Sequence, residues 1–161
     1  METIDIIVRV AQIEDLTSMQ ALFEIGDAYH RQAHPDIFKA PDNPDQTRGF
    51  IASLLTDPAS AVFVAQREGR LIGVLYVMEK ESSFSPILVK RRYAVIGNVV
   101  VHPAARRSGV GQALMEHAYE WAKARQLERV ELNVWEFNQG ARVLYEKLGY
   151  VTASRKMWKK I

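Results

Sequence analysis

The chain has 161 residues, 48% of them hydrophobic and 25% charged, so we expect one domain over residues 1–161 with a sizeable core. The formal net charge of +2 is too small to favour a nucleic-acid partner, and no apolar run approaches the roughly 20 residues that cross a bilayer. The absence of cysteine excludes disulfides, thiolate metal sites and a cysteine nucleophile, and we expect no metal.

The N-terminal third predicts a strand followed by two helices. Residues 1–5 are acidic and lack the basic start of a signal peptide, so we expect a cytoplasmic protein. Residues 4–10 are β-branched and partly alternating, which predicts a first strand. Asp15 stands at the N-cap position of a helix predicted over residues 16–31, and a second helix is predicted over residues 45–56.

Residues 30–46 join these two helices and contain three prolines, two histidines and one phenylalanine. This composition indicates a structured loop within the domain. Loops held by a rigid scaffold often carry substrate selectivity.

The middle of the chain predicts a sheet. Residues 61–66 and 70–78 are apolar runs joined by a short turn, which predicts an antiparallel hairpin. Residues 93–101 form the longest apolar run and are typical of a strand at the centre of a sheet. A helix follows from Val110, and residues 128–135 predict another strand. Because a strand–helix–strand crossover is right-handed, we expect these last two strands to be parallel.

The segment between the central strand and this helix predicts an anion site. The first turn of a helix has unpaired N–H groups and the positive end of the helix dipole. Gly109 and Gly111 allow a ligand to approach the backbone, and Arg106 and Arg107 add guanidinium donors that suit phosphate oxygens. We interpret the segment as a pyrophosphate cradle.

A last helix is predicted to begin at a capping Asn138 and to end before Gly149. After Tyr150 there is room for one strand.

Two motifs resemble those of the GCN5-related N-acetyltransferase (GNAT) family. The first is Arg106-x-x-Gly109-x-Gly111, preceded by Val99-x-Val101-x-Pro103, and the second is Asn138-x-x-Ala141-x-x-x-Tyr145-x-x-x-Gly149-Tyr150. With the strand between them they span about a third of the chain. The weaker pattern Arg9-x-Ala11-x-x-x-Asp15 is also similar to the start of this family. The resemblance implies an α/β (α+β) fold with a central mixed, mostly antiparallel sheet, a splayed parallel pair of strands at the cofactor, and helices on both faces.

The resemblance also implies a site for acetyl-CoA as co-substrate. The pyrophosphate would be bound by the backbone N–H groups of Arg106, Arg107, Ser108, Gly109, Val110, Gly111 and Gln112. The strand segment Val99, Val100 and Val101 would hold the pantetheine arm through the backbone of Val99 and Val101, helped by the amide of Asn138. Tyr145 would lie beside the cofactor sulfur and protonate the departing thiolate.

The implied reaction is N-acetylation, in which a primary amine of a small molecule or peptide attacks the thioester directly. By resemblance, the loop after the first helix forms a wall of the acceptor site, so Tyr29, His30, His34 and Phe38 are predicted to face the acceptor. Tyr29 and Phe38 favour a moderately apolar or aromatic acceptor. The alternative for all four residues is that the aromatic rings pack and the histidines are exposed.

The general base and the assembly state stay open. Many family members carry a carboxylate just before the cofactor motif, where this chain has Asn98, which cannot accept a proton. The remaining candidates are Glu79, Glu81, Glu131, Glu136, His30 and His34. The family often has two strands at the C-terminus where this chain has room for one, so a second subunit could complete the sheet in a homodimer.

Rival functions fit less well. A P-loop would need a lysine after its second glycine, and a dinucleotide-binding fold would need a small residue where Leu114 stands. The alternative on the same fold is a non-catalytic acyl-CoA-binding or sensor module, which the missing carboxylate favours and Tyr145 opposes.

Overall fold

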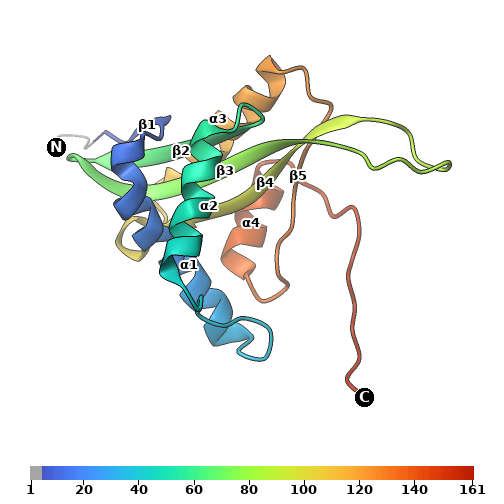
Figure 1. Cartoon of the computed structure of the whole chain (residues 1–161), viewed down its shortest axis with the longest axis horizontal. Coiled ribbons are helices and arrows are strands. Elements are labelled where there is room, and N and C mark those ends of the chain that lie inside the picture. The colour runs from blue at the N-terminus through green and yellow to red at the C-terminus, as the bar shows by residue number, and fades with distance from the viewer. Residues whose placement is uncertain (1–4) are drawn as a thin grey trace.

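The computed structural model describes residues 5–161, and five strands form one sheet in the order β1-β2-β3-β4-β5 (Figure 1). The elements along the chain are β1 (Ile7–Val10), η1 (Ile13–Asp15), α1 (Leu16–Ala33), α2 (Pro44–Thr56), β2 (Ser60–Arg67), β3 (Arg70–Glu81), β4 (Arg92–Val101), η2 (Pro103–Ala105), α3 (Val110–Ala124), β5 (Val130–Leu132) and α4 (Gln139–Lys147). The neighbours from β1 to β4 are antiparallel, and β4 and β5 are parallel. The mixed, mostly antiparallel sheet with one parallel pair is therefore confirmed.

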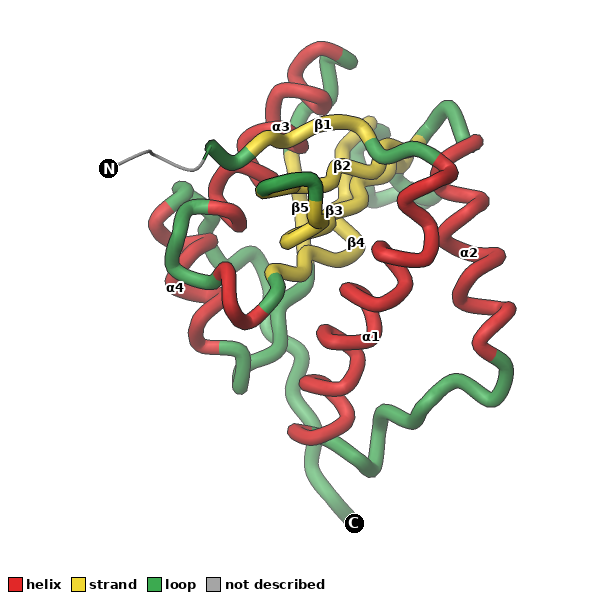
Figure 2. The backbone as a smooth tube through the Cα atoms, turned by 90° about the vertical axis from the view of Figure 1, so that its left-hand side faces the viewer, coloured by secondary structure: helices red, strands yellow, loops and turns green. Residues whose placement is uncertain are grey.

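Helices cover both faces of the sheet, as the resemblance implied. Figure 2 shows α1 and α2 on one side of the strands and α4 on the other. Two hydrophobic clusters fill the spaces between these layers. Met19, Phe23 and Ile51 pack on one face of the sheet, and Leu114 and Met115 of α3 pack on the other. The amphipathic pattern of each helix faces the sheet that it covers.

The start of the chain differs from the prediction in one detail. The first strand begins at Ile7, and Ile4, where the predicted strand starts, lies outside the described residues. Asp15 occupies the N-cap position of α1, but its carboxylate makes no capping bond. Instead it accepts hydrogen bonds from Arg9 Nη1 at 2.7 Å and Nη2 at 2.9 Å, and from the Gln12 N–H at 2.8 Å. The guanidinium of Arg9 lowers the pKa of Asp15, and this pair fastens the end of β1 to the start of α1.

The C-terminal side is less regular than predicted. β5 covers only Val130–Leu132 of the strand expected over residues 128–135, and residues 150–161 form no strand. These last residues are almost all exposed, and Arg155, Lys156, Lys159 and Lys160 interrupt their apolar residues, so they present no continuous apolar face to a sheet. The tail runs away from the sheet towards the end of α1 (Figure 1). The homodimer of the sequence analysis stays a prediction.

Candidate active site

β4 and β5 separate halfway along β4. The parallel pairing runs from Ala94 opposite Val130 to Ile96 opposite Leu132 and ends there. On the other edge, β4 stays paired with β3 as far as Val101 opposite Gly73, with a shift of register around Gly97. The bulge at this shift turns the end of β4 away from β5, so the edge of β4 after Ile96 is open towards β5.

The backbone of this open edge has a defined direction. The His102 N–H donates to Ile72 O of β3 at 2.8 Å, and alternate residues of a strand direct their N–H groups to the same side. The N–H groups of Val99 and Val101 therefore face the open edge, while the side chain of Val100 lies in the core beneath α1. This arrangement supports the predicted role of Val99 and Val101 as backbone partners of an extended ligand arm.

The predicted cradle follows directly at the end of β4. Arg107 and Gly109 both have left-handed backbone conformations, with φ of 59° and 84°, and α3 begins at Val110. The first hydrogen bond of the helix runs from the Ala113 N–H to Gly109 O at 3.0 Å. The N–H groups of residues 107–112 have no acceptor within residues 5–161. A row of free donors at the positive end of a helix attracts an anion.

Arg67 is a cation of this region that the sequence did not single out. It ends β2, and its Nη2 lies 3.3 Å from Ser108 Oγ, while its Nε is buried without a partner among the described residues. Arg106 reaches back along β4, where its Nε donates to Val101 O at 3.4 Å. The structure thus brings Arg67 to the predicted pair Arg106 and Arg107, which strengthens the positive field of the cradle.

Two further predicted residues connect the cradle to α4. A Cβ atom at Gly111 would lie 3.0 Å from Leu144 Cδ2, so this glycine permits close packing of α3 against α4. Asn138 Oδ1 caps α4 by accepting from the Ala141 N–H at 3.3 Å. This leaves the side-chain N–H donors of Asn138 with no partner within residues 5–161, and so available to a ligand.

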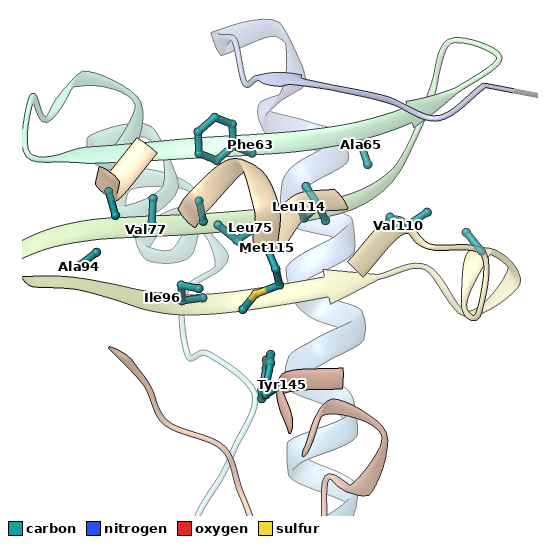
Figure 3. Packing of buried hydrophobic residues seen from close by; sticks show 13 residues of the cluster. Phe63, Ala65, Leu75, Val77, Ala94, Ile96, Val110, Leu114, Met115 and Tyr145 are labelled. Atoms are coloured by element: carbon teal, nitrogen blue, oxygen red, sulfur yellow. The ribbon is translucent and has the colours of Figure 1, made fainter. Parts of the chain in front are cut away.

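Tyr145 lies at the far end of the core cluster beneath α3. Its side chain is 8% exposed, and Figure 3 shows it on the far side of the strand that carries Ile96. Its ring centroid lies 5.9 Å from that of Tyr150. Burial raises the pKa of Tyr145 to about 12, so the hydroxyl holds its proton at neutral pH.

The four residues predicted to face the acceptor come together, and three aromatic residues from later segments join them. The aromatic cluster consists of Tyr29, His30, His34, Phe38, Trp135, Phe137 and Trp158. His34 is its centre, with ring centroids 5.3 Å from both Trp135 and Phe137 and 5.7 Å from Trp158. Sequence reasoning missed the last three residues because they follow β5 or lie in the tail.

Most of the base candidates are engaged elsewhere. Glu79 is bound by Arg92 and Arg125, and Glu131 by Arg91 at 2.5 Å, at the end of the sheet opposite the cradle.

The other candidates lie elsewhere. Glu136 pairs with Arg142 at 3.3 Å, and Glu81 is an exposed residue at the end of β3. His30 Nδ1 lies 2.8 Å from Gly26 O, and His34 Nδ1 lies 4.0 Å from Asp36.

Asp27 of α1 is a carboxylate that the sequence analysis did not consider. It is half-buried, has no hydrogen bond or ion pair within residues 5–161, and lines an open pocket of about 300 Å³ with Arg31 and Phe38. Its neighbour Gly26 packs on β4 so closely that a Cβ atom there would lie 2.8 Å from Val100 Cγ2. Burial and the nearby Glu24 raise the pKa of Asp27.

A sheet that opens beside an anion-attracting helix N-terminus, with a protonated phenol at the opening, is the architecture of an acyltransferase that uses CoA. The chain belongs to the acetyltransferase (GNAT) family, whose model matches residues 19–150. It is therefore an acetyl-CoA-dependent acyltransferase. The helices of residues 5–161 include none that is long and apolar enough to span a membrane.

One relative by sequence and two solved structures are similar to this chain, and the two structures share its fold. The uncharacterized N-acetyltransferase YhfO of Bacillus subtilis (strain 168) is 27% identical over 143 residues, which are 89% of this chain and 88% of YhfO. Among solved structures, a tetramutant of the BH1408 protein from Bacillus halodurans superposes with a TM-score of 0.86 at 23% identity, covering 96% of this chain and 99% of that one. The aminoglycoside N-acetyltransferase AAC(6')-Iy in complex with CoA gives a TM-score of 0.75 at 15% identity, covering 98% and 95% of the two chains.

Proposed function

We propose that this chain is an N-acetyltransferase that moves the acetyl group of acetyl-CoA to a primary amine by direct attack. The observation that supports it most is the row of unpartnered N–H groups over residues 107–112, placed where the open edge of β4 ends. Such a row holds a pyrophosphate, and the open edge extends it with the N–H groups of Val99 and Val101 for the pantetheine arm.

Bound acetyl-CoA would supply the thioester carbonyl and the thiolate that leaves it. A backbone N–H group of the open edge of β4 would polarise the carbonyl oxygen while the amine nitrogen forms its bond to the carbonyl carbon. Tyr145 Oη would donate its proton to the sulfur as the carbon–sulfur bond breaks. The raised pKa of Tyr145 supports this role, because the phenol is protonated when the thiolate develops.

Asp27 would take up the proton of the incoming ammonium, directly or through water. Its carboxylate lacks a partner in the described part of the chain, and its raised pKa brings it closer to neutral pH, where a general base is most effective. The rim of its pocket includes Phe38 of the aromatic cluster, so the pocket adjoins the predicted acceptor wall.

Calorimetric titration with acetyl-CoA and with CoA tests the proposal. We expect one-to-one binding with a micromolar dissociation constant, followed by thiol release when a primary amine is added. Binding without thiol release for a broad panel of amines would favour the acyl-CoA sensor. Absence of binding would contradict the whole assignment of the cradle.

The Asp27→Asn variant should gain stability and lose activity. Since burial raises the pKa of Asp27, any stability from this group is present below the ordinary pKa of aspartate and is lost as pH rises through the raised value. At pH 7 the variant should therefore melt at a higher temperature than the parent, and the difference should vanish in acid. We expect kcat/KM to fall about tenfold at pH 7 and to recover at a pH where the amine is already neutral.

The exposed Asp5→Asn variant is the matched control and should change neither quantity. A fall in both melting temperature and activity for Asp27→Asn would assign Asp27 a structural role and remove it as the proton acceptor.

A further inference from the structure

The aromatic cluster lies outside both hydrophobic cores. None of its seven rings is buried, and Tyr29 and Trp158 are 41% and 58% exposed. By contrast, Phe23 and Phe63, which pack between helices and sheet, are 5% and 6% exposed. Aromatic side chains that contact one another at the surface and stay partly exposed can bind the ring of a ligand, so we also call this aromatic cluster the platform.

The cluster also stands at the opening between β4 and β5. The contact of Gly26 with Val100 places α1 directly over the open part of β4, and Tyr29 and His30 follow on the next turn of this helix. Trp135 and Phe137 follow the end of β5, on the other side of the opening. Phe38 joins the two sides, because its ring centroid lies 5.3 Å from His30 and 5.2 Å from Trp135.

The C-terminal tail also contacts this platform. Figure 1 shows the C-terminal segment running beside the loop that follows α1. Trp158 is its contact point, with its ring centroid 5.7 Å from His34 and 5.8 Å from Trp135. Both aromatic contacts of Trp158 are therefore with residues of the candidate acceptor site.

The charges around the platform oppose a polycationic acceptor. A polycationic acceptor would need a carboxylate partner for each of its ammonium groups. Asp27 is the half-buried carboxylate here that lacks an ion pair within residues 5–161. The cations beside Asp27 are already paired, Arg31 with Glu24 and Lys39 with Asp42. Lysines stand on either side of Trp158 in the tail, and Asp36 lies 4.0 Å from His34. A site with one unpaired half-buried carboxylate favours an acceptor with one ammonium.

We infer that the acceptor is a primary amine attached to a flat aromatic or heteroaromatic ring, and that this ring packs against His34, Trp135 and Trp158. The inference rests on the proposed function and names the substrate class of the same site. Since the ring planes of His34 and Trp158 are inclined by 88°, a bound ring that stacks on one would meet the other edge-on, and both arrangements are favourable for aromatic pairs. The attached amine would extend towards Asp27 and the open edge of β4. The three residues are specificity residues and take no part in the chemical step.

Two amines with the same skeleton test this inference. 2-Phenylethylamine and 2-cyclohexylethylamine differ in the flatness of the ring and carry similar amine groups. We expect kcat/KM to be about tenfold higher for the phenyl compound, mostly through a lower KM. Spermidine, a polycation without a ring, should be poorer than both. Titration of each amine in the absence of turnover, followed by tryptophan fluorescence, should show saturable quenching with the phenyl compound at lower concentration.

Trp158→Leu and Trp135→Leu should bring the ratio of the two kcat/KM values close to one. Trp158 lies in the exposed tail, so its replacement should not disturb folding. Trp158→Leu therefore still tests the inference if Trp135→Leu folds poorly. Phe84→Leu removes a 98% exposed ring from the loop between β3 and β4 and should leave the ratio unchanged.

The two proposals fail differently. Acetylation of both ring compounds and spermidine with equal kcat/KM would overturn the inference and leave the N-acetyltransferase in place. Binding of 2-phenylethylamine in the fluorescence titration, lost in Trp158→Leu but without thiol release from acetyl-CoA, would keep the ring site and overturn the proposed reaction. Equal fluorescence responses to both amines would overturn the ring site.

Discussion

The Gly109→Asp variant should bind CoA at least about 100-fold more weakly than the parent chain, as measured by calorimetry. A Cβ atom at Gly109 meets nothing within 4 Å, so the new carboxylate would lie free among the donors of residues 107–112. A negative charge about 4 Å from a phosphate near a protein surface costs about 4 kcal/mol, which exceeds the energy needed for a 100-fold loss. The weakening should shrink as salt concentration rises, because exposed charges are screened.

Two control variants separate charge from backbone strain. Gly109→Asn has nearly the same shape as Gly109→Asp and tolerates the left-handed conformation, so it should weaken CoA binding far less. Gly149→Asp places the same carboxylate at another left-handed glycine, with φ of 89°, after α4, and should leave CoA affinity unchanged. Equal losses of CoA affinity for Gly109→Asp and Gly109→Asn would show that the presence of a side chain at this position, and not its charge, weakens binding. Unchanged affinity in both would remove the cradle as the phosphate site.

The cradle could be predicted because all of its residues are contiguous. A strand, a basic loop and a helix start are local patterns, so the sequence alone indicates free N–H groups beside Arg106 and Arg107. Arg67 could not be predicted from local patterns, since it reaches Ser108 only through the pairing of β2, β3 and β4.

The parallel pair could also be predicted, but not its length. The alternation of Val130, Leu132 and Val134 continues past the point where β5 ends. Pairing stops at Leu132 because the bulge at Gly97 turns β4 away, and this is a property of the partner strand. A strand pattern therefore shows which residues can pair, while the partner decides how many do.

The acceptor site, too, could be predicted only in part from the sequence. The residues from Tyr29 to Phe38 could be nominated because the end of α1 and the loop after it are contiguous, whereas Trp135 and Trp158 join them from much later segments. Asp27 did leave a signal, because it lies four residues after the buried Phe23 and so shares its face of α1. A carboxylate on the apolar face of a helix is a candidate that helical spacing alone would identify.

The Tyr145→Phe variant should lose about 100-fold in kcat while its affinity for acetyl-CoA stays unchanged. Phenylalanine keeps the ring that packs in the core beneath α3 and removes only the acidic proton, so folding should be preserved. Because burial raises the pKa of Tyr145 to about 12, the parent chain should show no loss of kcat up to about pH 10, where an ordinary phenol is half ionised. Thiol release at saturating acetyl-CoA measures both effects.

Tyr150→Phe is the matched control for this prediction. Its ring centroid lies 5.9 Å from that of Tyr145, and burial raises its pKa to about 12 as well, so the two phenols differ mainly in position. We expect Tyr150→Phe to keep kcat within about twofold, because its hydroxyl has no part in the proposed step. An equal loss in both variants would show that the two hydroxyls act as a unit. Full activity in Tyr145→Phe would mean that the thiolate takes its proton from water, and a chain without turnover in either form would have the properties of an acyl-CoA sensor.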